Sequence, residues 1–102
     1  MAEVTFGKES EIEEGKVVVK RFGRKRVAVC RFEGKFYAFK DECTHDNGAL
    51  DQGELCGNVI ECPRHGARFD VTTGAVLAAP AITPLEVYRT TVDESGIKVD
   101  LE

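Results

Sequence analysis

The sequence predicts an all-β domain, either a sandwich or a small barrel of antiparallel strands. Short runs of β-branched and aromatic residues recur along the chain, and glycine-containing turns separate them. The helical signal is weak by comparison. The chain has 102 residues, of which 42% are hydrophobic, and both values are typical of one globular domain. We therefore expect residues 1–102 to form a single domain.

The predicted strands lie at residues 17–19, 27–32, 36–39, 58–61, 87–92 and 97–100. Turn signals separate them, and Glu33-Gly34 joins two of these segments closely enough to predict a hairpin. Near the start of the chain, Ser10 is a candidate N-cap for a single helical turn, which Gly15 would end. Proline at both ends of residues 80–84 predicts a stiff loop before the last hairpin.

Charge and hydropathy exclude several classes of partner. The net charge is −4, which disfavours nucleic acid because phosphate binding requires a basic face. No segment approaches the roughly 20 apolar residues of a membrane span, and no apolar run typical of a signal peptide begins the chain. We therefore expect a cytoplasmic protein without membrane contact. In that compartment thiols stay reduced, and cysteine pairs bind metal more often than they form disulfides.

The most specific pattern is a pair of short boxes, Cys43-Thr44-His45 and Cys62-Pro63-Arg64-His65. Each box follows a predicted strand, so we expect two loops at one end of the domain to meet at a metal. Two sulfur and two nitrogen ligands suit zinc or an iron–sulfur cluster. Structural zinc fingers usually group their ligands as two cysteines and then two histidines. The alternating order found here instead lets each loop give its cysteine to one metal and its histidine to another, as a binuclear iron–sulfur cluster requires.

The two boxes resemble those of the Rieske family, and specifically the small soluble Rieske-type ferredoxins of bacterial multicomponent oxygenases. The matching segments are residues 43–50 and 60–70, and Thr73-Gly74 and the 80–84 loop are also similar. The resemblance implies a Rieske-like fold in which loops at about 43–50 and 62–70 form a cluster-binding subdomain and the loop at about 80–84 covers it.

The resemblance also implies the cofactor and its ligands. The cofactor would be a Rieske-type [2Fe-2S] cluster, with Cys43 and Cys62 on the inner iron and His45 and His65 on the outer, solvent-facing iron. A zinc site with the same four ligands, or a metal-free core, remains the alternative. In this interpretation no residue of the chain is catalytic.

Residues beside the boxes indicate a low reduction potential. High-potential Rieske proteins carry a disulfide between the boxes, and the positions that match its cysteines are Gly48 and Arg64. They also place a serine and a tyrosine that donate to cluster sulfurs, and the positions that match these are Ala67 and Phe69. Since hydrogen bonds to sulfur stabilise the added electron, their absence lowers the potential. We expect a midpoint near −150 mV, within about 100 mV, at the low end of the Rieske range.

The remaining cysteines are expected to have no ligand role. Cys30 lies in a strand of small and β-branched residues and is interpreted as a buried hydrophobe. Cys56 lies in a predicted turn between the boxes and is interpreted as an exposed thiol. A disulfide between the two is disfavoured by the compartment.

What the chain lacks favours an electron carrier over an enzyme. After His45 and His65 no histidine is left for the mononuclear iron of an oxygenase, and no Gly-x-Gly-x-x-Gly run is available for a dinucleotide. We predict a monomeric one-electron carrier that shuttles electrons from a flavin-containing reductase to a terminal oxygenase or similar acceptor. Two alternatives stay open. The chain could be a permanently bound small Rieske subunit of a reductase or oxidase complex, similar to nitrite-reductase small subunits, or a zinc-stabilised interaction module.

Overall fold

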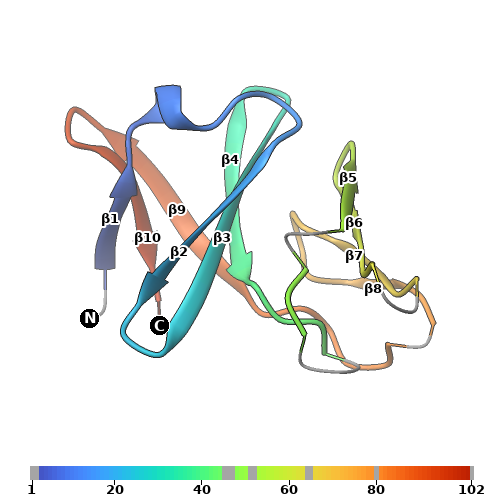
Figure 1. The fold of residues 1–102 in the computed structure, drawn as a ribbon. Coiled ribbons are helices and arrows are strands. Elements are labelled where there is room, and N and C mark those ends of the chain that lie inside the picture. The colour runs from blue at the N-terminus through green and yellow to red at the C-terminus, as the bar shows by residue number, and fades with distance from the viewer. Residues whose placement is uncertain (1–2, 45–47, 51–52, 64–65, 80, 102) are drawn as a thin grey trace.

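The computed structural model describes residues 3–44, 48–50, 53–63, 66–79 and 81–101, and in these ranges its regular secondary structure consists of β-strands and one short 3-10 helix (Figure 1). The elements in chain order are β1 (Glu3–Gly7), the 3-10 helix η1 (Glu9–Glu11), β2 (Val17–Phe22), β3 (Lys25–Phe32), β4 (Lys35–Lys40), β5 (Glu54–Cys56), β6 (Val59–Glu61), β7 (Arg68–Asp70), β8 (Val76–Ala78), β9 (Val87–Asp93) and β10 (Gly96–Asp100).

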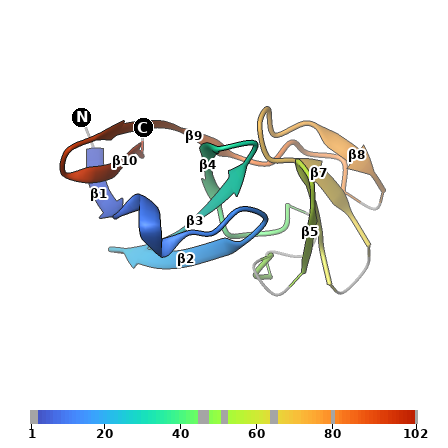
Figure 2. The ribbon, with the colours of Figure 1, turned by 90° about the horizontal axis from the view of Figure 1, so that it is seen from above.

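Six strands form a large antiparallel sheet in the order β1-β10-β9-β4-β3-β2. The sheet curls so strongly that its two edge strands face each other, as Figure 2 shows from above. The rings of Phe6 in β1 and Phe22 in β2 lie 6.0 Å apart, and the Lys20 ammonium in β2 donates to the Phe6 carbonyl at 2.7 Å. The large sheet is therefore a nearly closed barrel, which confirms the predicted all-β class.

The second sheet has four short antiparallel strands in the order β5-β6-β7-β8. It belongs to an insertion between two strands that are neighbours in the barrel, since β4 pairs directly with β9 through Ala38↔Tyr88 and Phe39↔Val87. A hydrogen bond from the Lys40 N–H to the Glu86 carbonyl, 2.9 Å long, lies at the base of this insertion. Residues 41–86 therefore leave and re-enter the barrel at one place.

Strand β3 serves two cores because its side chains alternate between the two faces of the sheet. Val27 and Val29 are buried inside the barrel, and Ala28 and Cys30 are buried on the opposite face, toward the small sheet. Strand β4 alternates in the same way, with Ala38 inside the barrel and Phe39 toward the small sheet. The packed space between the two sheets is where both box cysteines lie, as described below.

The structure contains all six predicted strand segments and four strands that were not predicted. The missed strands are β1 and three strands of the small sheet, β5, β7 and β8. Each of these three has only three residues, as β6 does, but none of them has two adjacent β-branched residues such as Val59-Ile60, the signal that identified β6.

The predicted N-cap at Ser10 is wrong. The 3-10 helix covers Glu9–Glu11, so its cap is Lys8 and Ser10 lies inside it. The Glu11 carboxylate accepts a hydrogen bond of 2.7 Å from the Lys8 N–H, which explains why the turn begins two residues earlier than predicted. In the ranges that the structure describes, no helix has the length and apolar character needed to cross a membrane.

The contact between Gly74 and Leu85 allows a test of what constrains the insertion formed by residues 41–86. Its φ is +85°, its N–H donates to the Asp70 carbonyl at 2.6 Å, and its carbonyl accepts from the Leu85 N–H at 2.8 Å. An added Cβ would overlap the Leu85 carbonyl oxygen, whereas at Gly34, where φ is +77°, it would meet nothing within 4 Å.

We expect Gly74→Ala to lower the free energy of unfolding by at least about 2 kcal/mol, and Gly34→Ala by only about 1 kcal/mol, the cost of the left-handed backbone alone. Chemical denaturation of both variants measures the difference. Equal losses would show that the contact between Gly74 and Leu85 does not constrain the insertion.

Candidate metal centre

Cys43 and Cys62 lie in the same buried cluster between the two sheets. Cys43 follows β4 and Cys62 directly follows β6, and their exposed fractions are 0% and 1%. Neither forms a disulfide, and they share this cluster with Phe39, Ile60 and Phe69, among other side chains. Two cysteines that are 19 positions apart in the sequence therefore place their side chains in one buried cluster.

The two loops are closed in the same way. The Cys43 N–H donates to the Gly48 carbonyl at 2.7 Å, and the Cys62 N–H donates to the Ala67 carbonyl at 2.7 Å. Each bond joins a cysteine to the fifth residue after it, and each predicted histidine lies between the two bonded residues in the sequence. His45 and His65 themselves, and Arg64, lie outside the described residues. Their part in a metal site therefore stays a prediction.

A buried carboxylate holds the end of the first loop. Asp41 is 1% exposed, and its Oδ1 accepts a hydrogen bond of 2.8 Å from the Leu50 N–H. Its backbone is tied to β3, because its carbonyl accepts from the Arg26 guanidinium at 2.8 Å and its N–H donates to the Arg26 carbonyl at 2.9 Å. Asp41 therefore links the barrel to both ends of the loop that carries Cys43.

A third segment packs beside the two cysteine loops. Ala81 and Leu85 are buried in the same cluster as Cys43 and Cys62. The Thr44 hydroxyl donates to the Thr83 carbonyl at 2.7 Å, which joins this segment to the first cysteine loop. Pro80, at the start of the predicted covering loop, lies outside the described residues.

The turn between β7 and β8 also binds the third segment, because the Gly74 carbonyl accepts a hydrogen bond from the Leu85 N–H. The Asp70 Oδ1 accepts from the Thr72 N–H at 2.9 Å and from its hydroxyl at 2.6 Å. Burial alone would raise the pKa of Asp70, but these hydrogen bonds, with others from Asn58 and the Thr73 backbone, outweigh it and lower the pKa. The charged carboxylate therefore stabilises the turn that presents Gly74 to Leu85.

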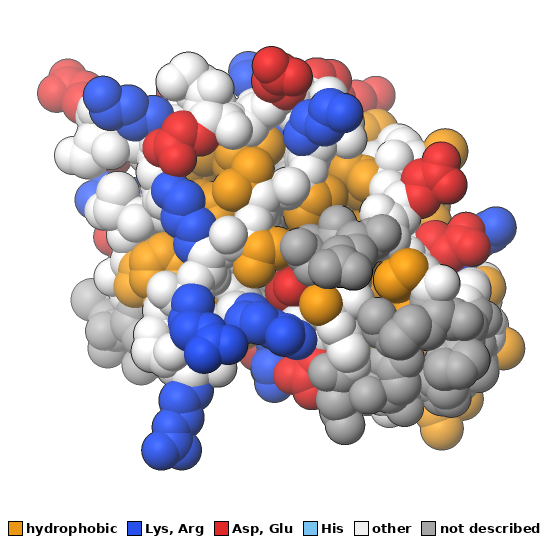
Figure 3. Space-filling view, viewed as in Figure 1, with side chains coloured by type: hydrophobic (Ala, Val, Ile, Leu, Met, Phe, Trp, Pro, Cys, Tyr) orange, Lys and Arg blue, Asp and Glu red, His pale blue; other side chains and the backbone are white. Residues whose placement is uncertain are grey.

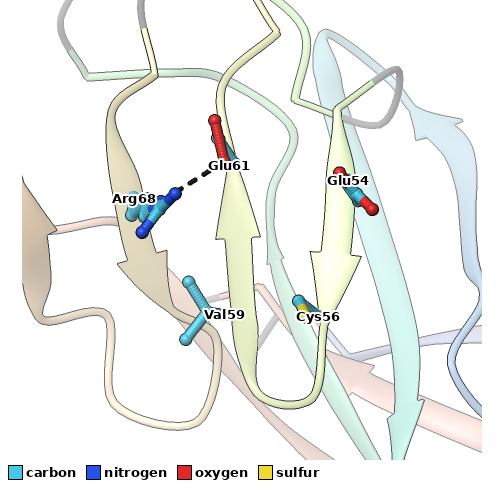
Figure 4. Close-up of a pocket in the computed structure, with 5 residues that line it drawn as sticks. All are labelled: Glu54, Cys56, Val59, Glu61 and Arg68. Atoms are coloured by element: carbon cyan, nitrogen blue, oxygen red, sulfur yellow. Dashed lines mark hydrogen bonds and ion pairs between the residues drawn. The ribbon is translucent and has the colours of Figure 1, made fainter.

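The other two cysteines have the burial that the sequence predicts. Cys30 is 0% exposed, and burial raises the pKa of its thiol to about 12, so it stays protonated as a small hydrophobe. Cys56 is exposed, as predicted, but its predicted position in a turn is wrong, because it is the last residue of β5. Figure 4 shows it in a hollow on the outer face of the small sheet, with Glu54, Val59 and the ion-paired Glu61 and Arg68, whose Oε1 and Nε lie 3.3 Å apart.

That outer face separates Cys56 from the buried cysteines. Leu55 and Ile60, the neighbours of Cys56 and Val59 along their strands, are directed toward the core between the sheets. Because neighbouring residues of a strand point to opposite faces, Cys56 and the core cysteines lie on opposite sides of the small sheet.

The donor set fits a thiolate-bound metal. Sulfur from cysteine is the ligand that iron–sulfur clusters require, and both sulfurs here belong to one buried cluster. Ala67 and Phe69 are also buried in this cluster, and neither side chain carries a hydrogen-bond donor. In the described part of the chain no three potential ligands gather, and this part contains only two of the four predicted ligands.

Comparison with known proteins shows the family. Residues 2–89 match the Rieske [2Fe-2S] domain. The ferredoxin CarAc of Metapseudomonas resinovorans is 43% identical over 81 residues, which cover 79% of this chain and 76% of that protein. The ferredoxin component of the naphthalene 1,2-dioxygenase system of Pseudomonas putida is 37% identical over 92 residues, covering 90% and 88%. A structure of the complex of reduced oxygenase and oxidized ferredoxin in carbazole 1,9a-dioxygenase contains a chain that superposes with a TM-score of 0.89 at 37% identity, covering 95% of this chain and 91% of that one.

The chain belongs to the Rieske [2Fe-2S] family. Its relatives are ferredoxin components of oxygenase systems, and the chain is accordingly an electron-transfer protein and not an enzyme. The predicted Rieske-like fold, the [2Fe-2S] cofactor and the role of electron carrier are thereby confirmed.

Asp41 was not recognised in the sequence. An acidic residue two positions before a cysteine is indistinguishable from an ordinary surface residue of a turn, and only the structure shows that it is buried. Its effect can be measured with two substitutions. Asp41→Ala leaves the buried Leu50 N–H without this acceptor, and we expect a loss of about 1–3 kcal/mol in the free energy of unfolding, together with a lower iron content.

Asp41→Asn retains a side-chain oxygen that can accept the same hydrogen bond, so it should recover most of both quantities. Denaturation curves and iron analysis of the purified proteins compare the two variants. An Asp41→Ala protein as stable and as iron-rich as the wild type would contradict this role of Asp41.

Proposed function

We propose that this ferredoxin carries single electrons from a flavin-containing reductase to a terminal oxygenase through a cluster held by Cys43, Cys62, His45 and His65. The observation that carries the proposal is the pair of buried cysteines on two loops closed by equivalent hydrogen bonds. In a Rieske protein the bound cluster accepts and releases one electron.

The ligand roles follow from the donor types. The two thiols occupy the buried side of the site, which suits the inner iron of the cluster. The two imidazoles would complete the outer iron, where a partner can approach. Thr44 and Leu50, on either side of His45 in the sequence, are hydrogen-bonded to Thr83 and Asp41 respectively, which fixes the two described ends of the first loop.

The partner assignment is supported by the relatives. A relative of known structure is described in a complex with its oxygenase, and other relatives are components of oxygenase systems. We further propose that residues 1–102 act as one domain, as a monomer in the cytoplasm, where the four cysteines stay reduced. Size-exclusion chromatography tests the monomer, cell fractionation tests the cytoplasmic location, and a single cooperative transition in chemical denaturation tests the single domain.

Single substitutions test the ligands. Replacing Cys43, Cys62, His45 or His65 by serine removes one of the four bonds that hold the cluster, and we expect each variant to lose the visible absorption and the electron paramagnetic resonance signal of a Rieske centre. Cys56→Ser is the matched control, because this thiol lies on the other side of the small sheet, and it should retain both signals. A serine variant at a proposed ligand position that keeps the native spectrum would remove that residue from the ligand set.

The midpoint potential tests the environment of the cluster. We expect a value near −150 mV, within about 100 mV, because Ala67 and Phe69 provide no side-chain donor to the sulfurs. Ala67→Ser and Phe69→Tyr each add a hydroxyl at a buried position and should raise the midpoint by tens of millivolts. A redox titration monitored by visible absorption measures all three proteins. A wild-type midpoint above zero would contradict this account of the potential.

A further inference from the structure

The β2–β3 hairpin has a charge opposite to that of the protein as a whole. Residues 20–26 contain five of the 14 lysines and arginines and no acidic residue, whereas the whole chain has a net charge of −4. We call this segment the basic hairpin. Its cationic residues are Lys20, Arg21, Arg24, Lys25 and Arg26.

The backbone of the basic hairpin is well supported. Phe22 and Lys25 are the last paired residues of β2 and β3, and Gly23, with a φ of +65°, forms the two-residue turn with Arg24. The Phe22 ring packs against Phe6 of β1, with ring centroids 6.0 Å apart. The charged side chains therefore project from a fixed element and not from a loose loop.

Most of these charges have no acidic partner. The Lys20 ammonium is 2.9 Å from Glu11 Oε1, so its charge is largely offset. Arg21 and Arg24 are exposed, and neither makes an ion pair with any residue that the structure describes. Lys25 donates to a neutral acceptor, the Leu101 carbonyl, at 2.9 Å. Three cations in five positions are thus presented to solvent without a described counter-ion.

The basic hairpin lies at the end of the barrel from which the metal centre extends. Arg26 bonds through both its side chain and its carbonyl to Asp41, which begins the segment leading to Cys43. In Figure 1 the β2–β3 turn, the segment after β4 and the segment before β9 all lie along the lower side of the molecule, and Figure 3 shows Lys and Arg side chains gathered over the hairpin on the same side. A partner surface of about 800 Å², roughly 30 Å across, can cover both the hairpin and the cysteine loops.

We propose that the basic hairpin is a docking site for an acidic patch on a protein redox partner, and that binding there places the partner over the cysteine loops. This inference rests on the proposed electron-carrying function. The docking surface would then be positive on a protein whose net charge is negative. An acidic patch on the partner would therefore be attracted only to the hairpin, which favours one orientation of the two proteins when they meet. A carrier that must bind and release two partners benefits from such salt-sensitive contacts.

The same observations favour a protein over the other anionic partners. Nucleic acids and anionic membranes present negative charge over a wide area, and the remainder of this acidic protein would be repelled by it. The hairpin offers no exposed apolar side chain for insertion into a bilayer, because Phe22 is packed against Phe6.

An electrode that carries carboxylate groups is a suitable probe, because it presents an acidic surface and also exchanges electrons. The experiment compares intact, cluster-loaded wild type with Arg21→Gln/Arg24→Gln and with the control Lys16→Gln/Lys35→Gln. Each double variant removes two positive charges. Lys16 and Lys35 are exposed residues at the beginnings of β2 and β4, which are the ends of these strands farther from the β2–β3 turn. Adsorbed mass reports docking, and the voltammetric wave reports electron transfer.

At low ionic strength we expect the wild type and the control to adsorb and to give a wave. The Arg21→Gln/Arg24→Gln protein should exchange electrons about fivefold to tenfold more slowly, with an unchanged midpoint in solution, and the difference should disappear at about 0.5 M salt. Equal losses in both double variants would overturn the proposal, because only net charge would then matter. It would also be overturned if the wild type responded only on an amine-terminated electrode.

Two further outcomes separate the hypotheses. Adsorption in the expected order without a wave from any of the proteins would overturn the proposed function and leave the basic hairpin as an anion-binding surface. Binding to a short DNA duplex that is lost in Arg21→Gln/Arg24→Gln, with no change at the carboxylate electrode, would overturn the docking proposal in favour of nucleic acid.

Discussion

The pairing of β4 with β9 is the constraint on which the remainder of this structure depends. Two barrel strands that are neighbours in space are separated in sequence by residues 41–86, so this whole segment must leave and re-enter at one place. The bond between Lys40 and Glu86 lies at its base. As a result, the first cysteine loop and the segment that packs beside it both start from the same end of the barrel, and the bond between Thr44 and Thr83 joins them. The second cysteine loop belongs to the small sheet, because Cys62 directly follows β6.

Packing on both faces of β3 and β4 couples this insertion to the barrel. Val29 and Cys30 are adjacent in sequence, yet one is buried inside the barrel and the other faces the metal centre. The buried thiols of Cys43 and Cys62 therefore rest on a layer whose other side is the barrel core. This arrangement explains how a chain of 102 residues can hold both cysteines in fixed positions, because they pack against a rigid sheet.

The sequence was sufficient for the fold class, the longer strands and the two cysteine boxes, because each of these has a local signal. Runs of valine and phenylalanine identify β3 and β4, and the order of cysteine and histidine distinguishes the boxes from those of a zinc finger. The strands β5, β7 and β8 of the small sheet and the roles of Asp41 and Gly74 could not be predicted in this way. They depend on contacts with residues 9 and 11 positions away, from Asp41 to Leu50 and from Gly74 to Leu85. The five cations of the basic hairpin are close together in the sequence, but only the structure shows that the hairpin lies beside Asp41 and therefore near the first cysteine loop.

The shared layer of β3 and β4 also bears on how the protein fails. Since the same backbone supports the barrel core on one face and the cysteine cluster on the other, opening of the barrel would also remove one side of the packing around Cys43 and Cys62. Melting of the barrel is therefore expected to release the cluster as well, so the thermal stability of the barrel sets an upper limit on the temperature at which this carrier transfers electrons.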